Sequence, residues 1–209
     1  MGDLKYFLGL EVARLKTGIA LYQRKYVLDL LKETGFEGCK PATTPIDYGE
    51  KLSKTTGNCS LILLRQILDC ATTEHLKAAH RMLCYIKGSP AASLFFSADS
   101  YLQLTGFSDS DWASCIDSYR SISTYCFYLE PSLVTWKSKK QLTVTTSSSE
   151  VEYRALALAT REAQWLSYVL QDLDVPITKP INFNCNSNSA IYIPTNPMNI
   201  QNILKLIAI

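Results

Sequence analysis

The chain has 209 residues, of which 47% are hydrophobic and 19% are charged, with a formal net charge of +2. This composition excludes a disordered chain and allows either one sizeable core or two modest ones. The small net charge excludes a strong global field, so any binding of nucleic acid must depend on a local basic patch.

Cysteine and histidine usage limits the possible chemistry. The seven cysteines are scattered, form no Cys-x-x-Cys pair, and are accompanied by only two histidines, His75 and His80. We therefore expect reduced thiols in an intracellular protein, cytoplasmic or nuclear, without a zinc site or a disulfide framework. No apolar run approaches the length that a bilayer requires, and we see no signal peptide.

The first part of the chain is predicted to form two strands and a helix. Residues 6–12 and 19–22 are rich in strand-forming residues, and the turn signal Lys16-Thr17-Gly18 separates them. A helix is predicted over residues 23–33, because its apolar residues cluster and Gly35 lies just beyond its end.

A polar, turn-rich linker follows at residues 39–58, and a second helix is predicted over 73–86 with Gly88 as its stop. His75 and His80 are five positions apart, so they should lie on different faces of this helix and are not expected to share a metal. We place a domain boundary after residue 90, which gives domains 1–90 and 91–209.

The second domain shows the pattern of an antiparallel meander followed by a helix. Strands are predicted at 94–96, 102–108, 125–129 and 133–136. A long helix should run from about 148 to 173, with Ser147 and Glu150 forming a capping box. A further strand at 181–185 and a short helix at 189–192 complete the pattern.

Two acidic motifs stand at the ends of predicted elements, one after a strand and one at the start of the long helix. The strand at 102–108 leads into Ser-Asp-Ser-Asp-Trp at 108–112, and the long helix begins with Glu-Val-Glu-Tyr-Arg-Ala-Leu at 150–156. Both blocks resemble the ribonuclease H region of Ty1/copia-type retrotransposon Pol polyproteins. Residues 3–12 resemble the segment that follows the catalytic Tyr-Val-Asp-Asp block of copia-type reverse transcriptases. No Asp-Asp pair occurs in this chain, so we assign it no reverse transcriptase active site.

This resemblance implies an α/β (α+β) fold: a ribonuclease H-like mixed sheet with helices, truncated at the C-terminus and preceded by a small α+β remnant of the reverse transcriptase. Residues 1–90 would be that reverse transcriptase C-terminal or connection remnant. Residues 58–70 match nothing in the family, which an internal deletion or an altered reading frame would explain.

The resemblance also implies cleavage of the RNA strand of RNA–DNA hybrids by two Mg²⁺ ions held by four acids. The first acid is Asp109, with Asp111 as the alternative, and the second is Glu152, since Glu150 has a capping task. The third position is degenerate because Asn186 replaces an acid, and Ala208 stands at the fourth. The competing interpretation is that the first pair of acids begins a turn and the second complements a helix N-terminus.

With half of the anionic ligands missing, Mg²⁺ binding and cleavage are expected to be weak or absent. A non-catalytic or vestigial protein that still binds nucleic acid is the alternative. Lys137, Lys139 and Lys140 form the basic cluster that would lie near the hybrid in the family's fold, although such a run is also typical of a solvated loop.

Overall fold

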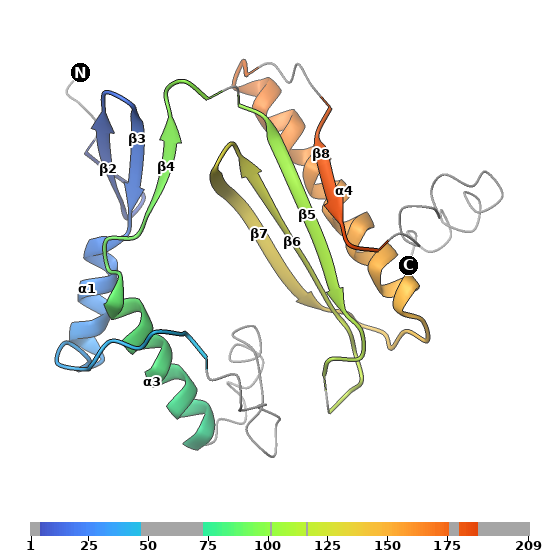
Figure 1. Ribbon diagram of the computed structural model, residues 1–209, viewed down its shortest axis with the longest axis horizontal. Helices are drawn as coiled ribbons and strands as arrows, with labels where there is room; N and C mark the ends of the chain where they lie inside the picture. The colour runs from blue at the N-terminus through green and yellow to red at the C-terminus, as the bar shows by residue number, and fades with distance from the viewer. Residues whose placement is uncertain (1–4, 47–72, 101, 116, 176–179, 188–209) are drawn as a thin grey trace. The chain divides into compact units, whose positions relative to one another are not determined.

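A computed structural model describes residues 5–46, 73–100, 102–115, 117–175 and 180–187. The chain divides into two compact units, Met1–Asp99 and Ser100–Ile209 (Figure 1). Among the described helices, none combines the length and the apolar character needed to cross a membrane. The unmatched segment 58–70, the short helix predicted at 189–192 and Ala208 lie outside the described residues.

The sheet of the first unit contains β1 (Tyr6–Phe7), β2 (Leu10–Leu15), β3 (Gly18–Tyr22) and β4 (Ser93–Ser97), all antiparallel in the order β1-β2-β3-β4. The hairpin between β2 and β3 was predicted. The single strand predicted over 6–12 was wrong, because Leu8 and Gly9 have positive φ angles of 48° and 81° and make a turn between β1 and β2.

The strand predicted at 94–96 belongs to the first unit and does not open the second. Its backbone pairs with β3, with Phe96 opposite Ile19 and Leu94 opposite Leu21. The unit boundary therefore falls after Asp99, whereas the sequence had suggested residue 90. The turn-forming residues 88–90 end the helix before them. The hydrogen bonds between β4 and β3 then keep the residues that follow in the first unit.

Two helices complete the first unit: α1 (Arg24–Glu33) and α3 (Thr73–Gly88). As predicted, α1 ends before Gly35, whose φ angle of 74° lets the Phe36 amide donate to the Leu31 carbonyl at 2.8 Å. The two helices contact each other, and the Phe36 ring packs on the ring of His80 at a centroid distance of 4.7 Å.

The second unit contains β5 (Leu104–Asp111), β6 (Ile122–Leu129), β7 (Ser132–Lys140), α4 (Ser148–Asp172) and β8 (Asn182–Cys185). Its sheet order is β7-β6-β5-β8; β5 and β8 are parallel, and the other pairs are antiparallel. Three strands, a long helix and a fourth strand follow each other as predicted. This is an α+β fold consistent with a ribonuclease H-like domain.

The core of the second unit forms where α4 packs on β5 and β6. Phe127 of β6 is fully buried there, between Leu104 and the small side chains of Ala159 and Ala163. Gly106 makes this packing possible, because a Cβ atom at that position would lie 2.5 Å from Cε1 of Phe127. The strand alternates, so Leu104, Gly106 and Ser108 are buried while the residues between them are more exposed.

One carboxylate of α4 also ties the helix to the sheet by hydrogen bonds. Glu162 accepts the Tyr125 hydroxyl at 2.8 Å and the Thr135 hydroxyl at 3.2 Å. Burial, aided by the hydrogen bond and the charge of Glu162, raises the pKa of Tyr125, so this phenol stays protonated and remains a donor.

The start of α4 differs from the predicted capping box. Ser147 occupies the N-cap position with an extended backbone, but its side chain makes no capping hydrogen bond. The carboxylate of Glu150 instead pairs with the guanidinium of Arg154, one turn further on, at 2.8 Å. The capping-box prediction was wrong because a charge-assisted contact within the helix competes for the Glu150 carboxylate.

Candidate functional site

Asp109 and Asn186 meet where β8 ends beside β5. Ser108 of β5 is opposite Cys185, the last residue of β8, so Asn186 follows the end of β8 next to Asp109, which is still within β5. The Asn186 amide donates to Oδ1 of Asp109 at 3.2 Å. The first and third positions of the predicted site are thus in direct contact, and they border a groove of about 680 Å³ with Phe107 and Trp136.

Glu152 lies on the first turns of α4, near the end of β5. Burial raises the pKa of Glu152, and the charges of Asp109 and Asp111 add to the effect, whereas the Ser110 hydroxyl lowers it. Its Oε2 atom is buried and has no hydrogen-bond partner among the described residues. Glu152 therefore feels the charges of both aspartates, so the structure leaves Asp111 open as an alternative to Asp109.

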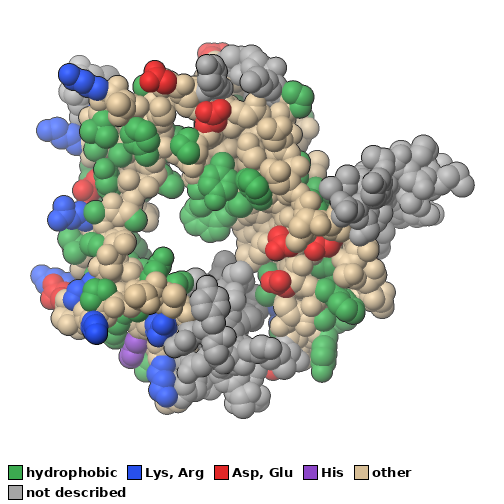
Figure 2. Space-filling model, in the orientation of Figure 1, with side chains coloured by type: hydrophobic (Ala, Val, Ile, Leu, Met, Phe, Trp, Pro, Cys, Tyr) green, Lys and Arg blue, Asp and Glu red, His purple; other side chains and the backbone are tan. Residues whose placement is uncertain are grey.

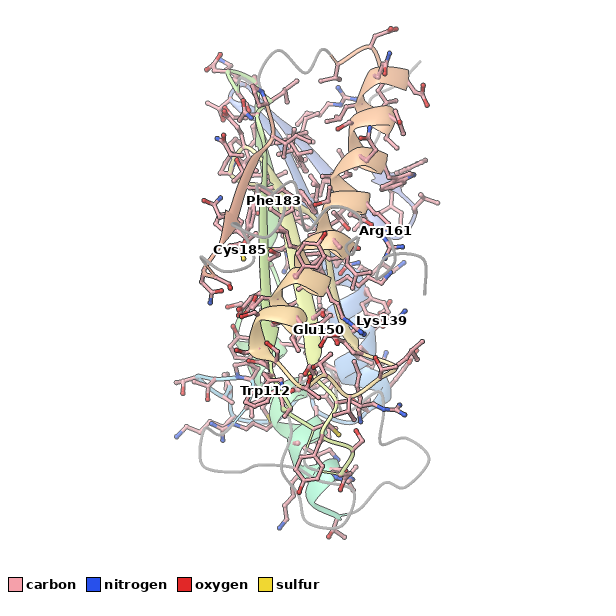
Figure 3. The ribbon with its side chains drawn as sticks, turned by 90° about the vertical axis from the view of Figure 1, so that its right-hand side faces the viewer. Trp112, Lys139, Glu150, Arg161, Phe183 and Cys185 are labelled. Carbon is pink, nitrogen blue, oxygen red and sulfur yellow. The ribbon has the colours of Figure 1, made fainter. Side chains whose placement is uncertain are left out.

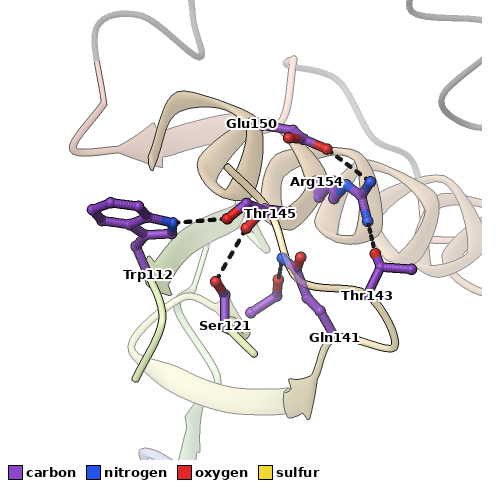
Figure 4. A network of polar contacts seen from close by, with 8 residues as sticks. Trp112, Ser121, Gln141, Thr143, Thr145, Glu150 and Arg154 are labelled. Atoms are coloured by element: carbon purple, nitrogen blue, oxygen red, sulfur yellow. Dashed lines mark hydrogen bonds and ion pairs between the residues drawn. The ribbon is translucent and has the colours of Figure 1, made fainter. Parts of the chain in front are cut away.

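A polar network holds the start of α4 against the end of β5 (Figure 4). The Trp112 indole donates to the Thr145 carbonyl at 3.2 Å, and the hydroxyls of Thr145 and Ser121 are 3.3 Å apart. Arg154 contacts both Glu150 and the Thr143 hydroxyl, the latter at 2.7 Å. The carboxylate of Glu150 is therefore paired with Arg154, a cation of the same helix.

The donor set at this site does not fit two Mg²⁺ ions. Among the described residues, no group of three or more His, Cys, Asp or Glu side chains is arranged to hold a metal ion. Asn186 brings a neutral amide that already donates to Asp109. A paired magnesium site depends on several anionic oxygen ligands, and the described residues of this site supply too few of them in the required arrangement.

The predicted basic cluster is separated by the structure into two parts. All three lysines lie on β7, which extends through the expected loop to Lys140. Lys137 and Lys139 are exposed and are opposite Tyr125 and Ser123 of β6. Figure 3 shows Lys139 in the half of the second unit where α4 begins, which also holds Glu150 and Trp112.

Lys140 is directed away from solvent and toward a thiol. Its ammonium donates to Sγ of Cys115 at 2.7 Å. Burial raises the pKa of Cys115, but hydrogen bonds from Lys140 and Ser118 outweigh this effect and lower it overall. Of the three lysines, only Lys137 and Lys139 remain exposed for an external phosphate.

A second basic surface, which the sequence did not reveal, lies in the first unit. Among the described residues, a groove of about 810 Å³ is lined by the cations Lys5, Arg14, Arg24 and Lys25, the tyrosines Tyr6 and Tyr22, and one acid, Glu11. Figure 2 shows Lys and Arg side chains spaced along the side of β2 and α1. We call this surface, with its four cations, the basic groove.

Glu11, the acid of the basic groove, already accepts a hydrogen bond. Its carboxylate accepts the backbone amide of Lys25 at 2.9 Å, at the first turn of α1. The ammonium of Lys25 lies 6.0 Å from the centroid of the Tyr6 ring. The only available sequence signal was the frequency of Lys and Arg between residues 5 and 25, because the groove forms only when β2 and α1 come together.

Comparisons with known proteins identify relatives along nearly the whole chain. It is 35% identical over 233 aligned residues to the retrovirus-related Pol polyprotein from transposon RE1 of Arabidopsis thaliana, covering 99% of this chain and 16% of that polyprotein. The polyprotein from transposon RE2 of the same plant is 33% identical, with 94% of this chain and 15% of the relative covered. An uncharacterized mitochondrial protein of Arabidopsis thaliana is 32% identical over 80% of each chain. No family model and no solved structure matches.

The fold is that of an α+β protein and is consistent with the ribonuclease H-like class. The chain belongs to the family of copia-type retrotransposon Pol polyproteins. It spans about a sixth of the length of the RE1 polyprotein. The RE1 alignment is longer than this chain's 209 residues, so RE1 carries residues that have no counterpart here.

Proposed function

We propose that this chain is a segment of a copia-type Pol polyprotein whose second unit descends from a magnesium-dependent nuclease for RNA–DNA hybrids and now cleaves weakly or not at all. One observation supports this proposal above the others. Asn186 occupies the strand end beside Asp109, where a two-metal nuclease needs a carboxylate, and donates a hydrogen bond to it.

The proposal follows from the charge balance at the site. Two dications require strong anionic compensation, and replacing one carboxylate by an amide removes a full negative charge from their shell. The pKa of Glu152 is raised by burial and by the charges of Asp109 and Asp111, so this carboxyl lies in a partly buried, acid-rich environment. Cleavage of the RNA strand should therefore be weak or absent.

The decisive experiment restores the missing charge. The assay uses a labelled RNA–DNA hybrid and Mg²⁺. We expect little cleavage by the natural chain and at least about tenfold more by Asn186→Asp. A tenfold gain corresponds to about 1.4 kcal/mol of more favourable metal binding. Adding Asp109→Asn to Asn186→Asp should abolish the gain.

Asn184→Asp provides a matched control. Asn184 is also exposed on β8, but its amide donates to the Gly106 carbonyl and not to Asp109. The same new charge two residues away should not increase cleavage. Efficient cleavage by the natural chain, lost in Asp109→Asn alone, would contradict the proposal.

The basic groove supports a second function, the binding of nucleic acid without cleavage. Phosphate contacts need only positive charge, and they supply most of the non-specific affinity for a nucleic acid strand. Four cations and two tyrosines in one groove satisfy that requirement, with the tyrosine rings available for stacking on bases. An RNA–DNA hybrid is the partner that the family resemblance suggests.

A further inference from the structure

Two cysteines that are far apart in the sequence meet in the first unit. Cys39 lies in the segment that follows α1, and Cys84 lies in the second half of α3. Both are free and partly buried. The segment that contains Cys39 lies against α3 at Cys84, because the Ala42 amide donates to the Cys84 carbonyl and Lys87 donates to the Cys39 carbonyl, and the Cys39 thiol raises the pKa of Cys84. The fold therefore presents a pair of adjacent thiols on two separate elements.

Backbone contacts fix the two thiols in this position. The ammonium of Lys87 donates to the Cys39 carbonyl at 2.6 Å, and the Ala42 amide donates to the Cys84 carbonyl at 3.2 Å. The Phe36 ring packs at a tilt on the ring of His80, one turn before Cys84 on α3, and holds the start of the same segment there. These contacts hold the backbone at both cysteines, so bringing the sulfurs together requires little further ordering of the chain.

We propose that Cys39 and Cys84 form a redox-modification site, at which a small disulfide such as glutathione disulfide converts the two thiols into an intramolecular disulfide. The thiolate of one cysteine attacks glutathione disulfide and releases one glutathione thiolate. The thiolate of the other then attacks the mixed disulfide and releases the second. Two cysteines are oxidised, one glutathione disulfide is reduced to two glutathione thiols, and the two cysteine protons pass to them.

The environment of Cys84 predicts how the reaction depends on pH. The hydrogen bond with Cys39 and burial raise the pKa of the Cys84 thiol, while the positive charge of Lys87 lowers it only partly. The thiolate is the nucleophile, so disulfide formation should be slow at neutral pH and accelerate as the pH rises. Once formed, the bond would close a long loop and fasten the segment after α1 to α3.

The experiment uses the full chain treated with glutathione disulfide at pH 8.5 and then denatured for thiol counting. The free thiols should fall from seven to five. Peptide mapping should recover one cross-linked pair that contains Cys39 and Cys84. Dithiothreitol should restore all of the thiols. Oxidation at pH 7.0 should proceed several-fold more slowly.

Single variants identify the partners. Cys39→Ser and Cys84→Ser should each abolish the cross-link, whereas Cys126→Ser, in the second unit, should leave it unchanged. The double variant Cys59→Ser with Cys70→Ser should also keep it. A cross-link from Cys39 or Cys84 to another cysteine, or mixed disulfides that never resolve into a cross-link, would overturn the proposal.

Discussion

At the scale of single residues, Glu152 carries an electrostatic cost in the folded protein. Its pKa is raised by burial and by the neighbouring charges of Asp109 and Asp111. The folded state therefore holds the proton of Glu152 more tightly than the unfolded chain, whose glutamate pKa is about 4.3. As the pH rises through the unfolded and then the folded pKa, ionisation of Glu152 costs stability.

We predict that Glu152→Gln increases the free energy of unfolding at pH 7.5 by up to about 1 kcal/mol, since the side chain is only partly buried. The gain should disappear below about pH 4, where Glu152 is protonated in both states. Urea titrations at the two pH values measure the effect.

Glu150→Gln is the matched control, two residues away on the same turn. Glu150 is paired with Arg154 and lies in the first turn of the helix, where a negative charge is favourable. This variant should lose a few tenths of a kcal/mol at pH 7.5. A loss of stability in Glu152→Gln at that pH would contradict the electrostatic account.

At the scale of elements, β5 depends on one glycine for its contact with β6. A Cβ atom on Gly106 would lie 2.5 Å from the fully buried Phe127 ring, which cannot move without disturbing its packing against Ala159 and Ala163. We predict that Gly106→Ala lowers the free energy of unfolding of the second unit by about 1 to 3 kcal/mol, as overpacking of a core does. Urea denaturation measures the loss.

Gly38→Ala is the control for this prediction. A Cβ atom there would meet nothing within 4 Å, and Gly38 is not among the residues with positive φ. Its effect should remain within about 0.5 kcal/mol. If Gly106→Ala were equally neutral, the close packing of Phe127 over β5 would be wrong.

At the scale of the whole molecule, the chain contains two units and each presents cations of its own. The first unit holds the basic groove, with four cations, and the second exposes Lys137 and Lys139 on β7. Each phosphate contact that is lost should reduce the dependence of binding on salt by about 0.7 to 0.9 in the logarithmic slope.

We predict that Arg14→Glu with Arg24→Glu weakens binding to a labelled RNA–DNA hybrid more than Lys137→Glu with Lys139→Glu does. The groove concentrates four cations, whereas β7 exposes two. Both double variants change the formal charge from +2 to −2, so a difference between them cannot come from net charge. Gel shifts at several salt concentrations measure it, and equal losses would argue against a specific role for the groove.

The sequence determined most of the second unit. Alternating residues around Phe107 and Phe127 and the long apolar face of α4 are local signals, and their order along the chain was enough to predict strands, helix and strand. Local signals also predicted that α1 ends before Gly35. They failed at Leu8 and Gly9, where a tight turn interrupts a run of residues that all favour strands.

Tertiary structure decided the features that depend on distant residues. Hydrogen bonding with β3 placed β4 in the first unit, and the pairing of β5 with β8 brought Asn186 to Asp109. The basic groove and the thiol pair of Cys39 and Cys84 are likewise formed by segments that do not adjoin in the chain. Periodicity along a chain specifies which residues face inward, but only the packing of whole elements determines which of those faces meet.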